Sequence, residues 1–366
     1  MTLGRWTEVP SRLFYYCKGL TSVTIPNSIT RIADGAFQQS GIKEVIFEEN
    51  SQLETIGFIA FNDTPLERFE MPDSVTTVGS SAFTWVGEYD QDNGSELRHL
   101  TLSKSLKTVG QYAFAGVACG ELELPEGLEE VGDYAFYGIQ NWKKVQIPST
   151  LKTIGEKAFI KTAGYTFEEE DKYVLKIGAG TEFIDECAFR NIQNIVGIEF
   201  TENGALRELA NYVFSDLPNL AGASIVFPEG LVEIGTQLFA YMKDSEYTIP
   251  LDESAPVKSV HIPSTVTFVG GYAFAYNNQL DTITFADNQT EGFELILGFA
   301  IVAHCPQLKS VELPCQLMRL AGGTILSPSG TFWNCPNLEE VYFRGRANGN
   351  DGALEISSVT FVGCGH

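Results

Sequence analysis

Basic side chains are scarce in this chain of 366 residues, in which 24 lysines and arginines stand against 47 aspartates and glutamates. The formal net charge of −23 disfavours the phosphate backbone of nucleic acids and the surface of anionic membranes. We therefore expect no nucleic-acid partner. Acidic groups on exposed loops would keep such a chain in solution, and a specific cationic partner is the alternative interpretation of the same charge.

Long apolar runs are also missing. No stretch of about 18 apolar residues occurs, so we expect no membrane insertion. The first twenty residues, MTLGRWTEVPSRLFYYCKGL, have no basic start followed by an apolar stretch and do not form a signal peptide. Two alternatives stay open, an intracellular protein or a piece of a longer secreted one.

The sequence contains none of the common catalytic motifs. His-Glu-x-x-His, Gly-x-Ser-x-Gly and a glycine-rich phosphate loop are all absent. Of the four histidines, His99 and His261 fall at outward positions of expected strands, and His304 adjoins a cysteine, which favours surface or edge histidines over acid–base catalysts. We expect no enzyme, no cofactor, and no catalytic or metal site.

What the chain does have is one phrase, roughly Ile-Pro-x-x-Leu-x-x-Ile-Gly-x-x-Ala-Phe, repeated from end to end. Residues 20–37 read LTSVTIPNSITRIADGAF, residues 66–83 read LERFEMPDSVTTVGSSAF, and residues 142–159 read WKKVQIPSTLKTIGEKAF. Most copies follow each other after 22 to 25 residues, and such a period predicts a solenoid in which each unit packs on its neighbours. The closing aromatic recurs as Phe14, Phe37, Phe61, Phe83, Phe114, Phe136, Phe159, Phe189, Phe214, Phe239, Phe274, Phe332 and Phe361, with Val302 in its place once.

One repeat shows how the coil is built. Leu20, Val23 and Ile25 alternate with polar residues, which predicts a short strand with one buried face, and Pro26 ends that strand because it lacks an N–H group. Residues 29–32 carry apolar side chains three apart, as in a tight turn of helix or 3₁₀-helix. A recurrent glycine then supplies either a special backbone conformation or a close approach of two chains. The closing alanine and phenylalanine are expected in the core.

The cysteines follow the same period. Their number is odd, and Cys17, Cys305, Cys335 and Cys364 each lie three residues after a repeat-closing position. A residue type fixed by the phase of the repeat predicts small buried thiols rather than a redox centre. A disulfide between stacked repeats is the alternative, and the absence of Cys-x-x-Cys argues against a metal site.

This pattern resembles the BspA-like (Treponema-type) leucine-rich repeat, L-x-x-[VI]-x-[IL]-P-x-x-[LV]-x-x-[IV]-G-x-x-A-F-x-x-C, over nearly the whole chain. The resemblance implies an α/β-type solenoid dominated by β-structure, a right-handed superhelix with one short parallel strand per repeat of about 23 residues and turns or short helices on the convex side. We expect a single domain over residues 1–366 with about 13 repeats. Both ends appear within a repeat, so exposed apolar edges and end-to-end self-association are expected.

The resemblance also implies a function. Members of the family are surface or secreted proteins of bacteria and sometimes of protists, and their known roles tend towards adhesion to host matrix proteins or to other cells. The implied function is a non-enzymatic protein-binding or adhesion module at the cell surface or outside the cell. A structural spacer rod within a larger surface protein is the alternative.

The candidate binding surface is the concave sheet. Its outward residues vary between repeats while the core positions stay constant, as an extended recognition surface requires, although plain solvent exposure would give the same pattern. The candidate binding residues are Arg68, Glu70, His99, Thr101, Glu121, Glu123, Lys144 and Gln146, and further outward positions are Lys176, Glu199, His261, Glu312 and Tyr342.

Three acidic insertions, residues 87–96, 165–172 and 243–256, are expected to form loops. The first insertion invites comparison with a calcium-binding loop, but its glycine is misplaced for an EF-hand and His99 stands where the bidentate glutamate should be. We expect a solvated loop there. The coil should be widened at residues 170–189, which lack the proline, and at residues 285–302, where the turn is longer.

Overall fold

The computed structural model describes the chain in two compact units, Met1–Asp171 and Lys172–His366. The single domain expected over residues 1–366 stays a prediction. The residues described are 6–86, 97, 99–117, 122–139, 142–160, 167–220, 222–239, 257–322, 330–345, 354–357 and 360–364.

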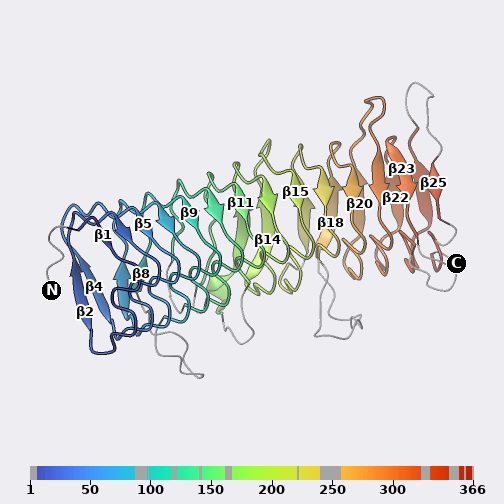
Figure 1. Cartoon of the computed structure of the whole chain (residues 1–366). Coiled ribbons are helices and arrows are strands. Elements are labelled where there is room, and N and C mark those ends of the chain that lie inside the picture. The colour runs from blue at the N-terminus through green and yellow to red at the C-terminus, as the bar shows by residue number, and fades with distance from the viewer. Residues whose placement is uncertain are drawn as a thin grey trace. The chain divides into compact units, whose positions relative to one another are not determined.

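In the first unit each repeat forms one coil, termed a rung here, and the rungs stack so that their strands run parallel (Figure 1). Two ladders result, and we call the one with longer strands the strand face and the one with two-residue strands the edge ladder. The strand face pairs β2 (Ser22–Ile25), β4 (Glu44–Phe47), β6 (Arg68–Glu70) and β8 (His99–Thr101). The edge ladder contains β1 (Glu8–Val9), β3 (Arg31–Ile32), β5 (Thr55–Ile56), β7 (Thr77–Val78), β9 (Thr108–Val109), β10 (Glu130–Val131) and β11 (Thr153–Ile154).

The second unit has the same two ladders, but its strand face is split into three short sheets. The first pairs β12 (Tyr173–Ile177) with β14 (Ile195–Phe200), the second pairs β16 (Ala223–Val226), β18 (Val257–Ile262) and β20 (Thr282–Phe285), and the third pairs β22 (Ser310–Leu313) with β24 (Glu340–Phe343). The edge ladder contains β13 (Phe183–Ile184), β15 (Glu208–Leu209), β17 (Glu233–Ile234), β19 (Phe268–Val269), β21 (Leu295–Leu297), β23 (Leu317–Leu320) and β25 (Glu355–Ile356).

The strand face follows from the alternating pattern of the sequence. In β6 the side chain of Phe69 is fully buried, while Arg68 and Glu70 on either side of it are exposed. In β2 the last residue, Ile25, is buried, and the strand stops at the proline that follows. The predicted fold class, a leucine-rich repeat solenoid dominated by parallel strands, is confirmed for each unit.

The edge ladder differs from the helix or 3₁₀ turn that we predicted for residues 29–32. The amide of Thr55 donates to the carbonyl of Thr30 at 3.2 Å, and the amide of Gly57 donates to the carbonyl of Ile32 at 2.8 Å. These bonds join successive rungs, whereas a helix would satisfy the same groups within its own turn. Within the described ranges the one helical element is a 3₁₀ turn, η1 (Glu169–Asp171).

The closing turns form a third set of bonds between rungs. Tyr112 and Gly116 lie two residues before and after the core residue Phe114, and both have left-handed backbone, with φ of 55° and 76°. The amides of all three residues donate to carbonyls of the next rung, at 2.8 to 2.9 Å. The same alternation recurs in most rungs, with a non-glycine residue at many of the left-handed positions. Left-handed backbone is unfavourable for such residues, so the bonds to the next rung hold it.

The predicted core positions are confirmed by a ladder of stacked rings. In the first unit the rings of Phe37, Phe61, Phe83 and Phe114 follow each other with centroids 5.1 to 5.3 Å apart and interplanar angles of 3° to 15°. All four side chains are fully buried. Stacking in this offset arrangement adds about 0.5–1.5 kcal/mol per pair to the burial of the rings. In the second unit Phe189, Phe214, Phe239 and Phe274 form a similar ladder.

The recurrent glycine is explained by close approach. A Cβ atom added at Gly79 would lie 2.7 Å from the carbonyl carbon of Gly57 and 2.8 Å from the amide nitrogen of Phe58. Gly79 is not in the left-handed region, so the contact with the preceding rung is what excludes a side chain. Of the two explanations that the sequence left open, the structure supports the second.

Of the four cysteines that follow the period of the repeat, two are fully buried, as predicted. Cys305 and Cys335 are fully buried, and their thiols donate to the carbonyls of Phe274 and Val302, the closing residues of the preceding rungs, at 3.4 and 2.9 Å. Cys364 repeats this bond and is half-buried. Cys17 is exposed, so the prediction is wrong there, and its rung is the first one that the structure describes.

We expect Phe83→Ala to lower the free energy of unfolding by about 3–5 kcal/mol, because it removes a fully buried ring from the middle of the ladder. Phe58→Ala is the matched control, since half of that side chain is exposed and its loss should cost less than about 1 kcal/mol. Urea unfolding followed by circular dichroism measures both. Equal effects of the two substitutions would contradict the stacked core.

The glycine contact gives a second prediction. Gly79→Ala should destabilise the protein by about 1–3 kcal/mol, because the added methyl group meets backbone atoms that cannot move independently. Gly19→Ala is the control: it has nothing within 4 Å of the added atom and lies outside the left-handed region. It should change stability by less than about 1 kcal/mol. The shift in thermal unfolding midpoint compares them, and a stable Gly79→Ala protein would refute the close-approach explanation.

Candidate binding surface

The first four predicted binding residues lie together on the strand face. Arg68 and Glu70 are outward residues of β6, and they pair in register with His99 and Thr101 of β8. All four side chains are exposed. The sequence prediction therefore placed these residues correctly, while their part in binding stays a prediction.

These side chains form a connected polar chain. The Arg68 guanidinium pairs with the Glu70 carboxylate, and the His99 imidazole lies 3.5 Å from the same carboxylate and 3.5 Å from the Thr101 hydroxyl. The hydrogen bond from Arg68, followed by its positive charge, lowers the pKa of Glu70 below its ordinary value. Because the pair is exposed, it orients the side chains more than it stabilises the fold.

The other four predicted residues do not extend this sheet. Glu123, Lys144 and Gln146 are exposed, but residues 122–125 and 142–148 form no strand, so their side chains lie beyond the last paired strand of the unit. Glu121 lies outside the described residues. Among the described members of the predicted set, Arg68, Glu70, His99 and Thr101 are the ones that lie on paired strands.

The outward positions of the second unit are engaged in polar contacts along and between strands. Lys176 lies 3.4 Å from Glu199, the His261 ring nitrogen Nδ1 lies 2.8 Å from the Thr284 hydroxyl, and the Tyr342 hydroxyl donates to Glu340 at 3.0 Å. Glu312 pairs with Arg344 at 3.5 Å.

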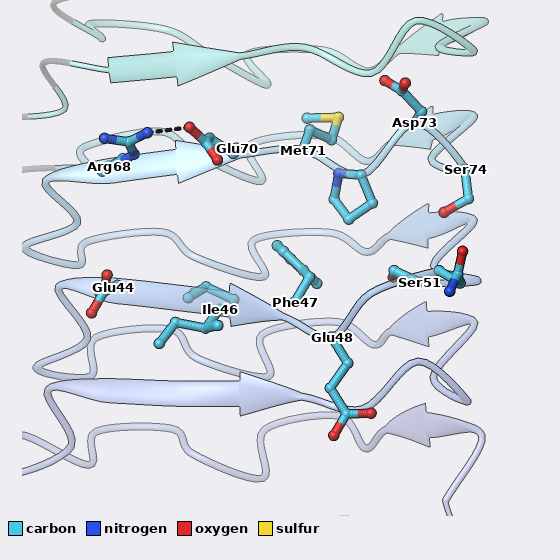
Figure 2. Close-up of a pocket in the computed structure, with 13 residues that line it drawn as sticks. Glu44, Ile46, Phe47, Glu48, Ser51, Arg68, Glu70, Met71, Asp73 and Ser74 are labelled. Atoms are coloured by element: carbon cyan, nitrogen blue, oxygen red, sulfur yellow. Dashed lines mark hydrogen bonds and ion pairs between the residues drawn. The ribbon is translucent and has the colours of Figure 1, made fainter.

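The first unit contains a groove of about 700 Å³ on the strand face, between β4 and β6 and the turns that follow them (Figure 2). Ile46 on its surface is 46% exposed, and the buried Met71 contributes to its lining. Four carboxylates line the groove, and one guanidinium, that of Arg68, is the cation among them. The carboxylates are those of Glu44, Glu48, Glu70 and Asp73.

The groove exists because two neighbouring strands part. β4 and β6 share the single register pair Glu44 and Arg68. Beyond it the amide of Glu48 donates backwards to Ile25 at 3.1 Å, and the amide of Met71 donates forwards to Thr101 at 3.0 Å. Each strand end is thus bonded away from the other.

The cause lies in a longer turn after β4. Six positions separate Phe47 from Leu53, whereas four separate Ile25 from Ile29 in the preceding repeat. The usual proline is missing from this turn, and Asn50 takes a left-handed conformation with φ of 58°, which asparagine tolerates better than most residues.

A second groove of about 430 Å³ repeats this arrangement in the second unit. It lies at the break between β14 and β16, which belong to different sheets. The turn after β14 has the same length from Phe200 to Leu206, and Asn203 has φ of 56°. Val226, 61% exposed, stands on its surface, and the carboxylates lining it are those of Glu199, Glu202 and Glu229.

The backbone bonds around the two grooves correspond position by position. The amide of Thr201 donates backwards to Ile177 at 3.3 Å, and that of Phe227 donates forwards to His261 at 3.2 Å. Sequence reasoning missed both grooves, although a signal was available. In both repeats the proline after the strand is missing, and the last strand residue begins the phrase Phe-x-Glu-Asn, at residues 47–50 and 200–203.

The acidic insertions are only partly described. Residues 87–96 and 243–256, with the candidate calcium loop, lie outside the described residues. In the remaining insertion Asp171 is buried and pairs with Lys143 at 3.0 Å, which lowers the pKa of Asp171. In the described part of the chain, no cluster of three or more histidine, cysteine, aspartate or glutamate side chains could hold a metal ion. No helix among these residues is long and apolar enough to cross a membrane.

Comparison with known proteins identifies the repeat. The model of the family described as "BspA type Leucine rich repeat region (6 copies)" matches residues 7–93, 87–163, 161–253 and 251–364. A leucine-rich repeat protein from Bacteroides ovatus is 20% identical, with a TM-score of 0.54, over 98% of this chain and 80% of that one. This likeness shows the fold. Among curated proteins no relative is found.

Two further solved structures are less similar. The pneumococcal vaccine antigen PcpA is 20% identical with a TM-score of 0.46, and 97% of this chain and 77% of that chain are covered. A leucine-rich cell surface protein from Faecalibacterium prausnitzii is 18% identical with a TM-score of 0.38, and 98% of this chain and 89% of that chain are covered.

The lowered pKa of Glu70 can be tested directly. A carboxyl pKa lowered by folding means that the pair with Arg68 contributes above the unfolded pKa and is lost as the pH falls through the folded value. We expect Arg68→Gln to raise the pKa of Glu70 towards its ordinary value, as followed by carbon NMR of the carboxyl group. Lys104→Gln, which removes the partner of Asp73 instead, should leave Glu70 unchanged. An unchanged Glu70 in Arg68→Gln would disprove the assignment.

Proposed function

Since the chain belongs to the BspA-type leucine-rich repeat family, we propose that it is a non-enzymatic module that binds another protein through its strand face. The proposal includes a place at a bacterial cell surface or outside the cell, in keeping with the resemblance of the repeat. The partner is a host matrix protein or a protein on another cell.

The observation that carries this proposal is the pair of grooves on the strand face. Each groove combines an exposed aliphatic side chain, Ile46 or Val226, with several carboxylates from the strands and from the turns that follow them. Protein-binding surfaces commonly combine apolar anchors with a polar rim. The side chains of a binding site are positioned more precisely on regular strands than on loops.

The edge ladder offers a natural comparison surface. In the first unit its exposed positions, such as Thr153 of β11, lie on strands of only two residues, and no edge-ladder strand contributes to the lining of either groove. Substitutions there should therefore disturb the surface without reaching the proposed binding face.

We expect immobilised protein to capture at least one member of a panel of purified host matrix proteins or intact neighbouring cells, measured by surface plasmon resonance and cell adhesion. Thr24→Arg and Thr282→Arg place a bulky cation on the strand face of each unit, at exposed positions of β2 and β20. We expect each substitution to weaken capture about tenfold or more, because the bulky side chain blocks contact with the strand face, and loss of a central contact typically has an effect of this size.

Thr153→Arg is the matched control, because it makes the same change on the edge ladder. It should leave capture unchanged. Capture that is insensitive to both strand-face substitutions, or that falls equally with the control, would rule out the strand face. A complete absence of capture by the native protein would favour the spacer rod.

A further inference from the structure

A third break in the strand face shows what such a groove accommodates. β20 and β22 belong to different sheets, and the turn after β20 begins with the same phrase, Phe-x-acid-Asn, at residues 285–288. At this break a guanidinium group of the chain itself, that of Arg344, lies between the two strand ends.

The contacts of Arg344 define the chemistry of the position. One terminal nitrogen donates to the backbone carbonyl of Phe285 at 2.7 Å, and the other pairs with the Asp287 carboxylate at 2.8 Å. The Nε atom lies 3.5 Å from the Glu312 carboxylate. The guanidinium thus pairs with one acid from each side of the break and with the carbonyl at the strand end.

Each open groove contains the corresponding strand end and one of the two corresponding acids. Phe47 and Phe200 occupy the position of Phe285, and neither has a strand partner in the following rung. Glu202 occupies the position of Asp287 in the second groove, and Glu70 occupies that of Glu312 in the first.

The cation, however, is missing from the corresponding positions. Strand register places Ser103 and Pro263 where Arg344 stands, one rung beyond each open groove. Neither residue carries a charge. Arg68 lines the first groove but pairs with Glu70 along its own strand. Lys104 pairs with Asp73 at 3.2 Å from outside the lining, so the four carboxylates still outnumber the two cations beside them.

From this correspondence we propose that each open groove receives an arginine side chain of a partner polypeptide. This inference rests on the proposed function and specifies the partner as an extended segment in which arginine adjoins an aliphatic residue. The guanidinium reaches the strand-end carbonyl and the flanking carboxylates, and the aliphatic neighbour packs on Ile46 or Val226. The planar fork of donors, which lysine lacks, matches this set of acceptors.

Charge complementarity supports the choice of a cation. The chain is acidic overall, and each groove has more carboxylates than cations in its lining. The aliphatic side chain at each groove adds an anchor that a purely ionic surface would not have. A segment with both features matches the grooves better than a uniformly basic one.

The probe for this test is the heptapeptide Val-Arg-Val-Arg-Val-Arg-Val with blocked ends, titrated into the intact protein. Calorimetry should give two sites, and methyl NMR should show shifts at Ile46 and Val226. The citrulline version keeps the shape but lacks the charge, and it should bind at least about tenfold more weakly. The lysine version should fall between the two. Equal binding of the arginine and lysine peptides, with no shift at either methyl group, would overturn the proposal in favour of general attraction to an acidic surface.

Paired substitutions separate the two grooves. Ile46→Ser with Glu70→Gln should remove one site, and Val226→Ser with Glu202→Gln should remove the other. The matched controls are Phe58→Ser and Phe268→Ser, which alter exposed apolar residues off the strand face. These should keep both sites, and retention of two sites in the groove variants would refute the assignment.

Arg344 provides an independent test. Arg344→Ala vacates the third position, so the folded variant should bind a third equivalent of the arginine peptide. If the variant instead loses stability, added methylguanidinium should restore its melting temperature. A folded variant with two sites, or an unstable one that methylguanidinium does not restore, would count against the proposal.

The outcome also distinguishes this inference from the function on which it rests. Suppose that capture of a matrix protein is lost in Thr24→Arg and Thr282→Arg but is unaffected by both groove variants. This result would support strand-face binding and overturn the proposal that the grooves bind arginine. Peptide binding at both grooves without capture of any protein or cell would support the grooves and contradict the proposed partner class.

Discussion

The bonding of each rung to the next is the constraint on which the rest of this molecule depends. Along the closing turns, alternating right- and left-handed residues direct every second amide to the neighbouring rung, as Tyr112, Phe114 and Gly116 show. Left-handed backbone at a tyrosine is unfavourable by itself. It persists because the same geometry places the phenylalanine rings in register and satisfies the backbone groups of the turn.

Register between rungs also explains why small residues recur where they do. At Gly79 the preceding rung approaches so closely that no side chain fits, and the thiol of Cys335 reaches a carbonyl one rung away. These positions are constrained by a neighbouring copy of the same backbone. A repeat therefore tolerates change on its outer surface and in its turns far more readily than at these contacts.

Variation in turn length is what gives the regular stack its distinctive surface. Two extra residues after β4, and again after β14, direct a strand end to the rung before it while the next strand bonds to the rung after it. The strand face then opens at that point into a groove with apolar and acidic walls. At the third break the side chain of Arg344 bridges the same kind of opening. Binding chemistry thus arises from local departures from the repeat rather than from the repeat itself.

The sequence by itself determined the stacked fold, the strand that ends before each proline, and the phenylalanine core, because these features recur with a period that comparison of the copies reveals. It also placed Arg68, Glu70, His99 and Thr101 on the outward side of their strands, since alternation fixes the facing of a strand. The edge ladder was predicted as helix or 3₁₀ turn, because apolar spacing within residues 29–32 cannot show bonds made to another rung. Only the tertiary structure decided where neighbouring strands part, since this depends on which of two rungs each strand end bonds to. The grooves, and the correspondence between Phe47, Phe200 and Phe285, follow from that choice.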